Sequence, residues 1–431
     1  MELREYPALG ERVFYEKMPD GLPVYVLSRP GSSRQFAFFA ARCGGSTICI
    51  PDGCGGWETV PAGTAHYLEH KMFDMPDGGA SEKFGESGAA DNAFTSASMT
   101  GYYFTGTRDF EQNLRILLDM VSVPYFTAES VEKERGIIEQ EVRMTEDDPG
   151  DESYSRLLEM MYAADPVRTR VVGSTASIRE ITPELLYRFH KACYRAGNMV
   201  LVVGGDLDAG QVCSVVRETL GDRLAGTAWI PPVWKEPEDC ICHERTEEME
   251  VAVPLFQMGF KGAAAPAGRR MRQELMARLA CDALASPSAP LYSRLYDAGV
   301  INGEFSCVYD ESTETSARLV FGGESEDSRQ VRDALLAETE RLGREGIDAA
   351  LWERLVRAAY GSKLRELDDL REVCIGIAAA HLEGEDYFSF PALFAELRKE
   401  DAEELLRSWC TKERCALFEA RPKGGAQGAA D

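Results

Sequence analysis

The sequence predicts an α+β protein built from two homologous domains, each a mostly antiparallel sheet packed with helices. A chain of 431 residues is too long for one ordinary hydrophobic core, so two domains of about 200 residues are expected. In each half, strand-like segments precede long helical segments, which is typical of an α+β arrangement. A weak repeat supports duplication, because Phe-Thr-Gly at 104–106 and Phe-Gly-Gly at 321–323 precede similar apolar patterns. The predicted domains are residues 1–225 and 247–431, joined by a linker at 226–246 that is rich in proline and acidic residues.

The expected elements follow from residue type and periodicity. Segments rich in β-branched and aromatic residues predict strands at 12–17, 22–28, 35–42, 90–104, 198–204, 250–260, 304–322 and 416–420. Helical periodicity predicts helices at 62–73, 81–88, 109–121, 128–145, 151–162, 183–193, 268–285, 327–343 and 348–366, with more helix to about 408. The Gly- and Ala-rich tail after Arg421 is expected to be disordered.

Net charge, apolar runs and cysteine spacing argue against several classes of function. The formal net charge of −25 argues against binding to nucleic acid or to an anionic membrane surface. The N-terminus lacks the apolar core of a signal peptide, and no apolar run of about 18 residues predicts a membrane span. The twelve cysteines form no C-x-x-C pair and suit reduced thiols, so a cytoplasmic protein is expected.

The stretch at residues 63–70, Gly-Thr-Ala-His-Tyr-Leu-Glu-His, contains the most informative pattern in the chain. His66 and His70 are four residues apart, so on a helix they lie one turn apart on the same face, where both can bind one metal ion. Glu69 lies between them in sequence. H-x-x-E-H is the inverted form of the H-E-x-x-H zinc-protease motif. Thr64 is expected to cap this helix.

A catalytic zinc ion needs a third protein ligand. On the acidic helix near residues 132–141, Glu134 and Glu141 are seven residues apart and share one face. Glu141 can bind the metal while Glu134 supports an imidazole N–H from behind. Alone, the same acidic pattern is typical of a solvated helix face. A cluster at 240–243, Cys-Ile-Cys-His, is either a second metal site or an incidental group in the linker.

Together these segments resemble the insulinase, pitrilysin and mitochondrial-processing-peptidase superfamily of zinc peptidases. The matching residues are 63–73, 92–95, 100–103, 134–141, 171–173, 177–178 and 198–206. The resemblance implies that His66, His70 and Glu141 bind Zn²⁺, that Glu69 is the general base, and that Glu134 supports the site. It also implies that Asn92 and Ala93 lie on an edge strand that pairs with the peptide substrate. Glu139 is the alternative ligand, because the family usually has a slightly longer interval after the second histidine.

The second half departs from this family in one respect. Members supply an Arg and a Tyr from that half, or from a partner, to stabilise the oxyanion. Here Tyr296 occupies the position of the Arg, and Asn302 and Gly303 lie near that of the Tyr. A homologous partner subunit, or a second copy of the chain, is expected to bring the pair. The alternative is that the chain is itself impaired, or that it uses different donors, with Arg294 or Tyr292 in place of the pair.

The predicted function is therefore that of a zinc-dependent endopeptidase, or the catalytic subunit of a heterodimeric one, that hydrolyses peptides or unfolded polypeptides. In this prediction, Glu69 activates a zinc-bound water that attacks the scissile carbonyl. One alternative is a non-proteolytic structural or peptide-binding subunit of the same superfamily. A zinc hydrolase that does not act on peptides is the third hypothesis.

Overall fold

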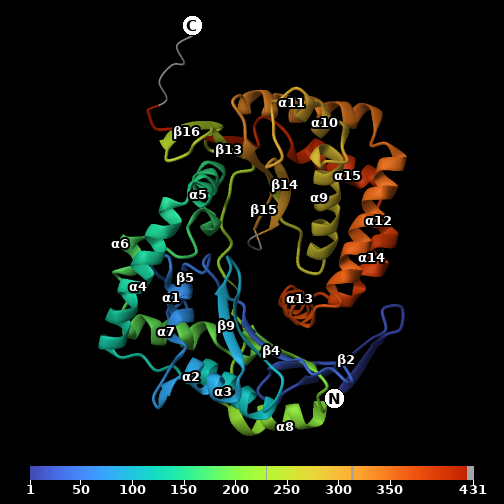
Figure 1. Cartoon of the computed structure of the whole chain (residues 1–431). Coiled ribbons are helices and arrows are strands. Elements are labelled where there is room, and N and C mark those ends of the chain that lie inside the picture. Colours follow the sequence, from blue (N-terminus) through green and yellow to red (C-terminus); the bar gives the residue numbers. More distant parts are fainter. Residues whose placement is uncertain (230, 312–314, 425–431) are drawn as a thin grey trace. The chain divides into compact units, whose positions relative to one another are not determined.

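The computed structural model describes residues 1–229, 231–311 and 315–424, which form two compact units (Figure 1). Each unit is assembled from three separate stretches of chain. Unit 1 contains Met1–Val142, Arg170–Pro232 and Leu364–Ser389, and unit 2 contains Arg143–Thr169, Val233–Lys363 and the residues from Phe390 on.

Unit 1 is organised around a seven-stranded sheet with the order β1-β2-β3-β11-β4-β10-β9. Its strands are β1 (Glu2–Tyr6), β2 (Glu11–Lys17), β3 (Pro23–Ser28), β4 (Gln35–Ala41), β9 (Ala90–Thr95), β10 (Thr100–Gly106) and β11 (Met199–Gly205). β11 pairs parallel with β3, and every other neighbouring pair is antiparallel. β9 therefore forms one edge of the sheet.

Helices cover both faces of this sheet. One face packs with α1 (Thr64–Lys71), α2 (Ala80–Ser87), α3 (Phe110–Ser122), α4 (Ala128–Asp147), α7 (Pro183–Cys193) and α8 (Ala209–Leu220) around a single apolar core. α13 (Leu370–Leu382) packs on β4 and β11 from the opposite face (Figure 1). Gly204 permits this approach, because a Cβ atom there would lie 2.5 Å from Leu370 Cδ1.

Unit 2 has a five-stranded sheet with the order β12-β16-β13-β15-β14. The strands are β12 (Glu244–Met249), β13 (Leu255–Ala263), β14 (Ser306–Glu311), β15 (Ser316–Glu324) and β16 (Cys415–Pro422). α5 (Pro149–Met161) packs on β13 and β16, and α9 (Arg270–Ala285) packs on β14. The remaining helices are α10 (Pro290–Asp297), α11 (Ser328–Glu345), α12 (Ala349–Glu366), α14 (Phe390–Glu396) and α15 (Lys399–Trp409).

The two sheets share one topology. The order β3-β11-β4-β10-β9 in unit 1 corresponds to β12-β16-β13-β15-β14 in unit 2, and the parallel pair is in the same place in both. The sequence repeat marks equivalent positions, because residues 104–106 end β10 before α3 and residues 321–323 lie near the end of β15 before α11. The α+β fold class with mostly antiparallel sheets is thus confirmed.

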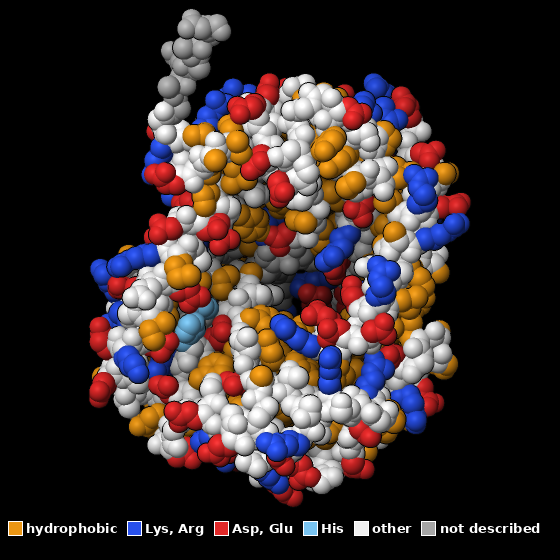
Figure 2. Space-filling view, in the orientation of Figure 1, with side chains coloured by type: hydrophobic (Ala, Val, Ile, Leu, Met, Phe, Trp, Pro, Cys, Tyr) orange, Lys and Arg blue, Asp and Glu red, His pale blue; other side chains and the backbone are white. Residues whose placement is uncertain are grey.

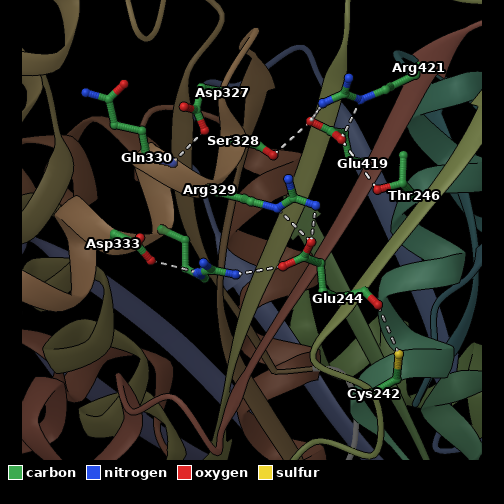
Figure 3. Close-up of polar contacts among 11 residues, drawn as sticks. Cys242, Glu244, Thr246, Asp327, Ser328, Arg329, Gln330, Asp333, Glu419 and Arg421 are labelled. Carbon is green, nitrogen blue, oxygen red and sulfur yellow. Dashed lines mark hydrogen bonds and ion pairs between the residues drawn. The ribbon is translucent and has the colours of Figure 1, made fainter.

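Charged side chains attach the start of α11 to the strands of unit 2. Arg329 points from the helix to the Glu244 carboxylate of β12, at 2.7 Å from its Nε atom (Figure 3). The Ser328 hydroxyl donates to Glu419 of β16 at 3.0 Å, and Asp327 caps the helix by accepting from Gln330 N. This network fixes α11 against the parallel strand pair.

Several predicted elements differ from the structure. The single strand expected at 90–104 is a hairpin, because Ser96 forms a turn in which its N–H donates to Met99 O at 2.8 Å. The strand expected at 250–260 begins only at Leu255, after Pro254, which has no N–H to donate to a sheet. β1 was not expected, because a segment with this many charged residues does not indicate a strand. It nevertheless pairs with β2. The tail prediction falls mostly on residues 425–431, outside the described part.

Two helices belong to a different unit from the one that their position in the sequence suggests. α13 belongs to unit 1 although it follows most of unit 2 in sequence, and α5 belongs to unit 2 although it follows the acidic helix α4. The domain limits at 225 and 247 remain a prediction. Among the described residues, no helix is both long and apolar enough to cross a membrane.

Candidate metal centre

The helix that carries the H-x-x-E-H motif starts at a tight backbone contact. Gly63 precedes α1 with a φ of 88°, in the left-handed region that favours glycine, and a Cβ atom there would lie 2.7 Å from Val172 O. The predicted cap by Thr64 is wrong. Its hydroxyl donates to Pro61 O at 2.6 Å, and the N-cap position belongs to Gly63, which has no side chain.

Side chains of α1 fix its position relative to α4. The buried Tyr67 hydroxyl donates to Val131 O at 2.5 Å, and the Lys71 ammonium donates to Ser130 O at 3.2 Å and to the Asp74 carboxylate. These contacts bring one face of α1 to one face of α4. They explain how residues more than 60 positions apart in sequence meet in space.

His66, His70 and Glu141 converge at this helix pair. One ligand atom from each lies within 4.8 Å of the others. The Nε2 atoms of His66 and His70 are 3.4 and 3.5 Å from the Glu141 carboxylate oxygens. Ligands about 2.0–2.1 Å from a tetrahedral zinc ion are about 3.3–3.4 Å apart, so both histidine–glutamate distances fit zinc. Two imidazoles and one carboxylate are also a donor set that zinc accepts. Figure 2 shows imidazole side chains at the surface beside carboxylates, over the region of α1 in Figure 1.

Glu134 supports the second histidine. Its Oε1 lies 3.1 Å from His70 Nδ1, which leaves His70 Nε2 for a metal. The hydrogen bond to His70 lowers the pKa of Glu134, and the hydrogen bond to His66 lowers the pKa of Glu141. Burial opposes the charged form of His70, but Glu134, Glu141 and Glu69 together raise its pKa. His66 differs, because its buried Nδ1 has no hydrogen-bond partner in the structure.

Glu69 lies on α1 directly before His70, and its side chain is buried. Its Oε2 accepts a hydrogen bond of 2.5 Å from the Thr95 hydroxyl of β9. Burial is the largest influence on this carboxyl group and raises its pKa, although Thr95 and the two histidines act in the opposite direction. A carboxylate with a raised pKa beside a metal site is suited to accepting and returning a proton.

The predicted substrate residues Asn92 and Ala93 lie in β9, the edge strand next to this centre. The Ala93 N–H donates to the Asn92 side-chain oxygen at 2.8 Å. An edge strand offers backbone groups that can pair with an added extended peptide. Thr95 is the site residue that the sequence reasoning missed, although it belongs to the Asn-Ala-Phe-Thr motif that was recognised.

The alternative ligands have other partners. Glu139 accepts from Arg179 at 2.8 Å and is not part of the three-residue group. In the 240–243 cluster, the Cys240 thiol donates to Arg414 O, the Cys242 thiol to Glu244 O, and His243 Nδ1 lies 2.9 Å from Cys415 O. Among the residues the structure describes, only His66, His70 and Glu141 form a group of at least three ligand-type side chains that could hold a metal ion.

The proposed replacements for the family's Arg and Tyr lie on α10 in unit 2. Arg294 forms an ion pair of 2.6 Å with the buried carboxylate of Glu338 on α11. The rings of Tyr292 and Tyr296 stack with their centroids 5.9 Å apart. The Arg294 guanidinium is thus engaged by a carboxylate within its own unit.

Comparisons with known proteins identify the family of this chain. Residues 55–175 match the family model for insulinase, peptidase family M16, and residues 180–359 match the model for the peptidase M16 inactive domain. The uncharacterized zinc protease YmfH of Bacillus subtilis is 32% identical over 97% of this chain and 99% of its own length.

Solved structures show the same fold. An M16-like peptidase from Alicyclobacillus acidocaldarius superposes with a TM-score of 0.89 at 28% identity, covering 97% of this chain and 100% of that one. A protease from Helicobacter pylori gives 0.83 at 16% identity, covering 96% and 100%, and shows the fold alone. The match to YmfH over nearly its whole length, together with the two family models, means that this chain belongs to the insulinase family of peptidases, family M16.

Proposed function

We propose that this chain is a zinc-dependent endopeptidase, or the catalytic subunit of a heterodimeric one, that hydrolyses peptides or unfolded polypeptides. The single observation that carries the proposal is the convergence of His66, His70 and Glu141 beside the buried Glu69 carboxylate. The name of the B. subtilis relative and the match to the insulinase model support the same activity.

In this proposal each residue has a defined task. His66, His70 and Glu141 hold the metal, and Glu134 keeps His70 in the tautomer that leaves Nε2 free. When bound, zinc supplies a Lewis acid that polarises a carbonyl and lowers the pKa of water toward about 7. Glu69 accepts the proton of the attacking water and later delivers it to the leaving amine.

The edge strand β9 orients the substrate. Backbone pairing along Asn92 and Ala93 holds a peptide extended, so the same strand receives substrates of different sequence. Such positioning contributes to rate by fixing the scissile bond relative to the reacting groups. This favours segments without stable structure of their own, because a folded substrate has few free strand-forming backbone groups.

We also propose that a partner subunit, or a second copy of this chain, completes the oxyanion site. The observation behind this is that Tyr296 replaces the expected Arg and that Arg294 is paired with Glu338. The purified chain alone is then expected to bind zinc and to cleave peptides slowly. Full turnover by a demonstrated monomer contradicts this part of the proposal.

The presence of Tyr296 at the position of the expected Arg also supports one other candidate, a non-proteolytic subunit of the family. The decisive comparison is wild type against Glu69→Gln on a peptide library, with zinc content measured for both. Glu69→Gln is expected to keep the metal and lose at least about 100-fold in rate, as loss of a general base implies. If the two proteins cleave at equal rates, or if neither cleaves with any partner, the peptidase assignment is wrong.

A further inference from the structure

Thr95 donates a hydrogen bond that fixes the Glu69 carboxylate. Its hydroxyl lies 2.5 Å from Glu69 Oε2, and no other described residue donates a hydrogen bond to this carboxylate. Glu69 is largely buried, with 8% of its surface exposed, so water cannot replace the contact freely. A hydrogen bond to a carboxylate is stronger than one between neutral groups.

A second threonine lies beside Thr95 and leaves its proton to Glu69. Thr100 is its cross-strand partner in the β9–β10 hairpin, and their Oγ1 atoms are 3.3 Å apart. The hydroxyl of the fully buried Thr100 donates to Cys43 O at 2.9 Å. Each hydroxyl has a single proton. Thr100 donates its proton to Cys43 O, and Thr95 donates its proton to Glu69 Oε2, which is closer to it than Thr100 Oγ1 is.

The backbone around Thr95 leaves little freedom. The turn after it closes through Ser96 N–H to Met99 O at 2.8 Å, and Gly45 N–H donates to Ser96 O at 2.9 Å. Gly44 is packed closely there, since a Cβ atom would lie 2.3 Å from Ser96 O. Thr95 is thus a fixed donor on a rigid support, while the Glu69 side chain has several rotatable bonds.

We propose that Thr95 is a positioning residue, which holds the Glu69 carboxylate in the orientation that serves proton transfer. This inference rests on the proposed function of Glu69 as the general base. Thr95 acts through Glu69 and does not contact the peptide through its side chain, whereas substrate pairing uses the backbone of β9. Its loss should therefore lower kcat and leave KM almost unchanged.

The test compares Thr95→Val, which has the same shape without the hydroxyl, with Thr95→Ser, which keeps the hydroxyl. Thr95→Val is expected to lower kcat about 10- to 100-fold, the effect of losing one hydrogen bond to a charged group, with KM within about two-fold. Thr95→Ser is expected to restore most of the rate. Thr105→Val is the matched control, because it places the same substitution at an exposed position on β10 and should change nothing.

Readouts other than activity separate positioning from folding and from metal loss. All variants are expected to bind one zinc ion and to unfold near the wild-type temperature. In the Glu69→Gln background, adding Thr95→Val should change neither the residual rate nor the Kd for an uncleaved peptide, since the group being positioned is already disabled. Crystal structures should show one Glu69 rotamer in wild type and Thr95→Ser, and more than one in Thr95→Val.

Two results overturn the inference. One is wild-type kcat in a folded, zinc-loaded Thr95→Val protein. The other is a Thr95→Ser protein as impaired as Thr95→Val, which means that the methyl group and packing matter instead. If Thr95→Val unfolds, Thr95→Ala serves as the second variant without a hydroxyl, and the same rate and rotamer comparisons with Thr95→Ser apply to it. Failure of the proposed function is recognised separately, because only then does Glu69→Gln cleave at the wild-type rate.

Discussion

Replacing Glu134 tests whether this carboxylate supports the metal site through His70. Glu134 Oε1 is 3.1 Å from His70 Nδ1, and its side chain is 19% exposed. Glu134→Ala removes the acceptor, so the imidazole loses the contact that fixes its orientation and tautomer. Glu134→Gln removes the charge but keeps an oxygen that can accept the Nδ1 proton.

The expected loss of zinc affinity follows from the loss of one hydrogen bond to a charged group. Loss of a hydrogen bond to a charged group costs about 1.5–3 kcal/mol, and loss of such support to a metal-binding histidine weakens metal binding about 10- to 100-fold. The two ranges agree, because each factor of ten in Kd corresponds to about 1.4 kcal/mol. Glu134→Ala is therefore expected to weaken zinc binding by close to about 100-fold, and Glu134→Gln by about 10-fold or less.

Zinc affinity is measured for every variant by competition with a chromophoric chelator at one fixed pH of about 7.5. Glu139→Gln is the matched control, because Glu139 lies on the same helix and pairs with Arg179 instead. It should bind zinc like wild type. Wild-type affinity in Glu134→Ala, or an equal loss in Glu139→Gln, would refute the reasoning.

Two further predictions concern stability. His190 is buried, and burial lowers its pKa to about 4 although its ring contacts Val121 O. Since an unfolded histidine titrates near about 6.5, its contribution is complete above that pH and is lost as the pH falls toward 4. From pH 7 to pH 5 it should remove about 2 kcal/mol from the unfolding free energy. Urea titrations at several pH values should show that the unfolding free energy of wild type falls more steeply between pH 7 and pH 5 than that of His190→Gln. If the two unfolding free energies change in parallel with pH, the prediction is contradicted. Lys261→Met breaks the buried 2.7 Å ion pair with Glu236 and should cost about 3 kcal/mol, the lower limit for such pairs, because Glu236 keeps three backbone N–H donors. A loss below about 1 kcal/mol in urea unfolding contradicts this.

Local patterns predicted which side chains share a helix face. His66 and His70 share a face because of the helical period, and the same period relates Glu134 to Glu141. The boundaries of α1, α4 and β11 also follow closely from local signals. Glycine and proline marked where strands stop, but the Ser96 turn inside residues 90–104 was overlooked because Ser-Ala-Ser lacks those residues.

The sequence alone thus determined the pairing of His66 with His70 on one helix face and the α+β class, since both depend on residues a few positions apart. Only the tertiary structure decided that Glu141 and not Glu139 faces the histidines, and that α13 packs in unit 1. It alone placed Thr95 against Glu69. These contacts depend on strand register and on the packing of α1 against α4. Both are fixed by the burial of side chains from distant segments, and no local period contains that information.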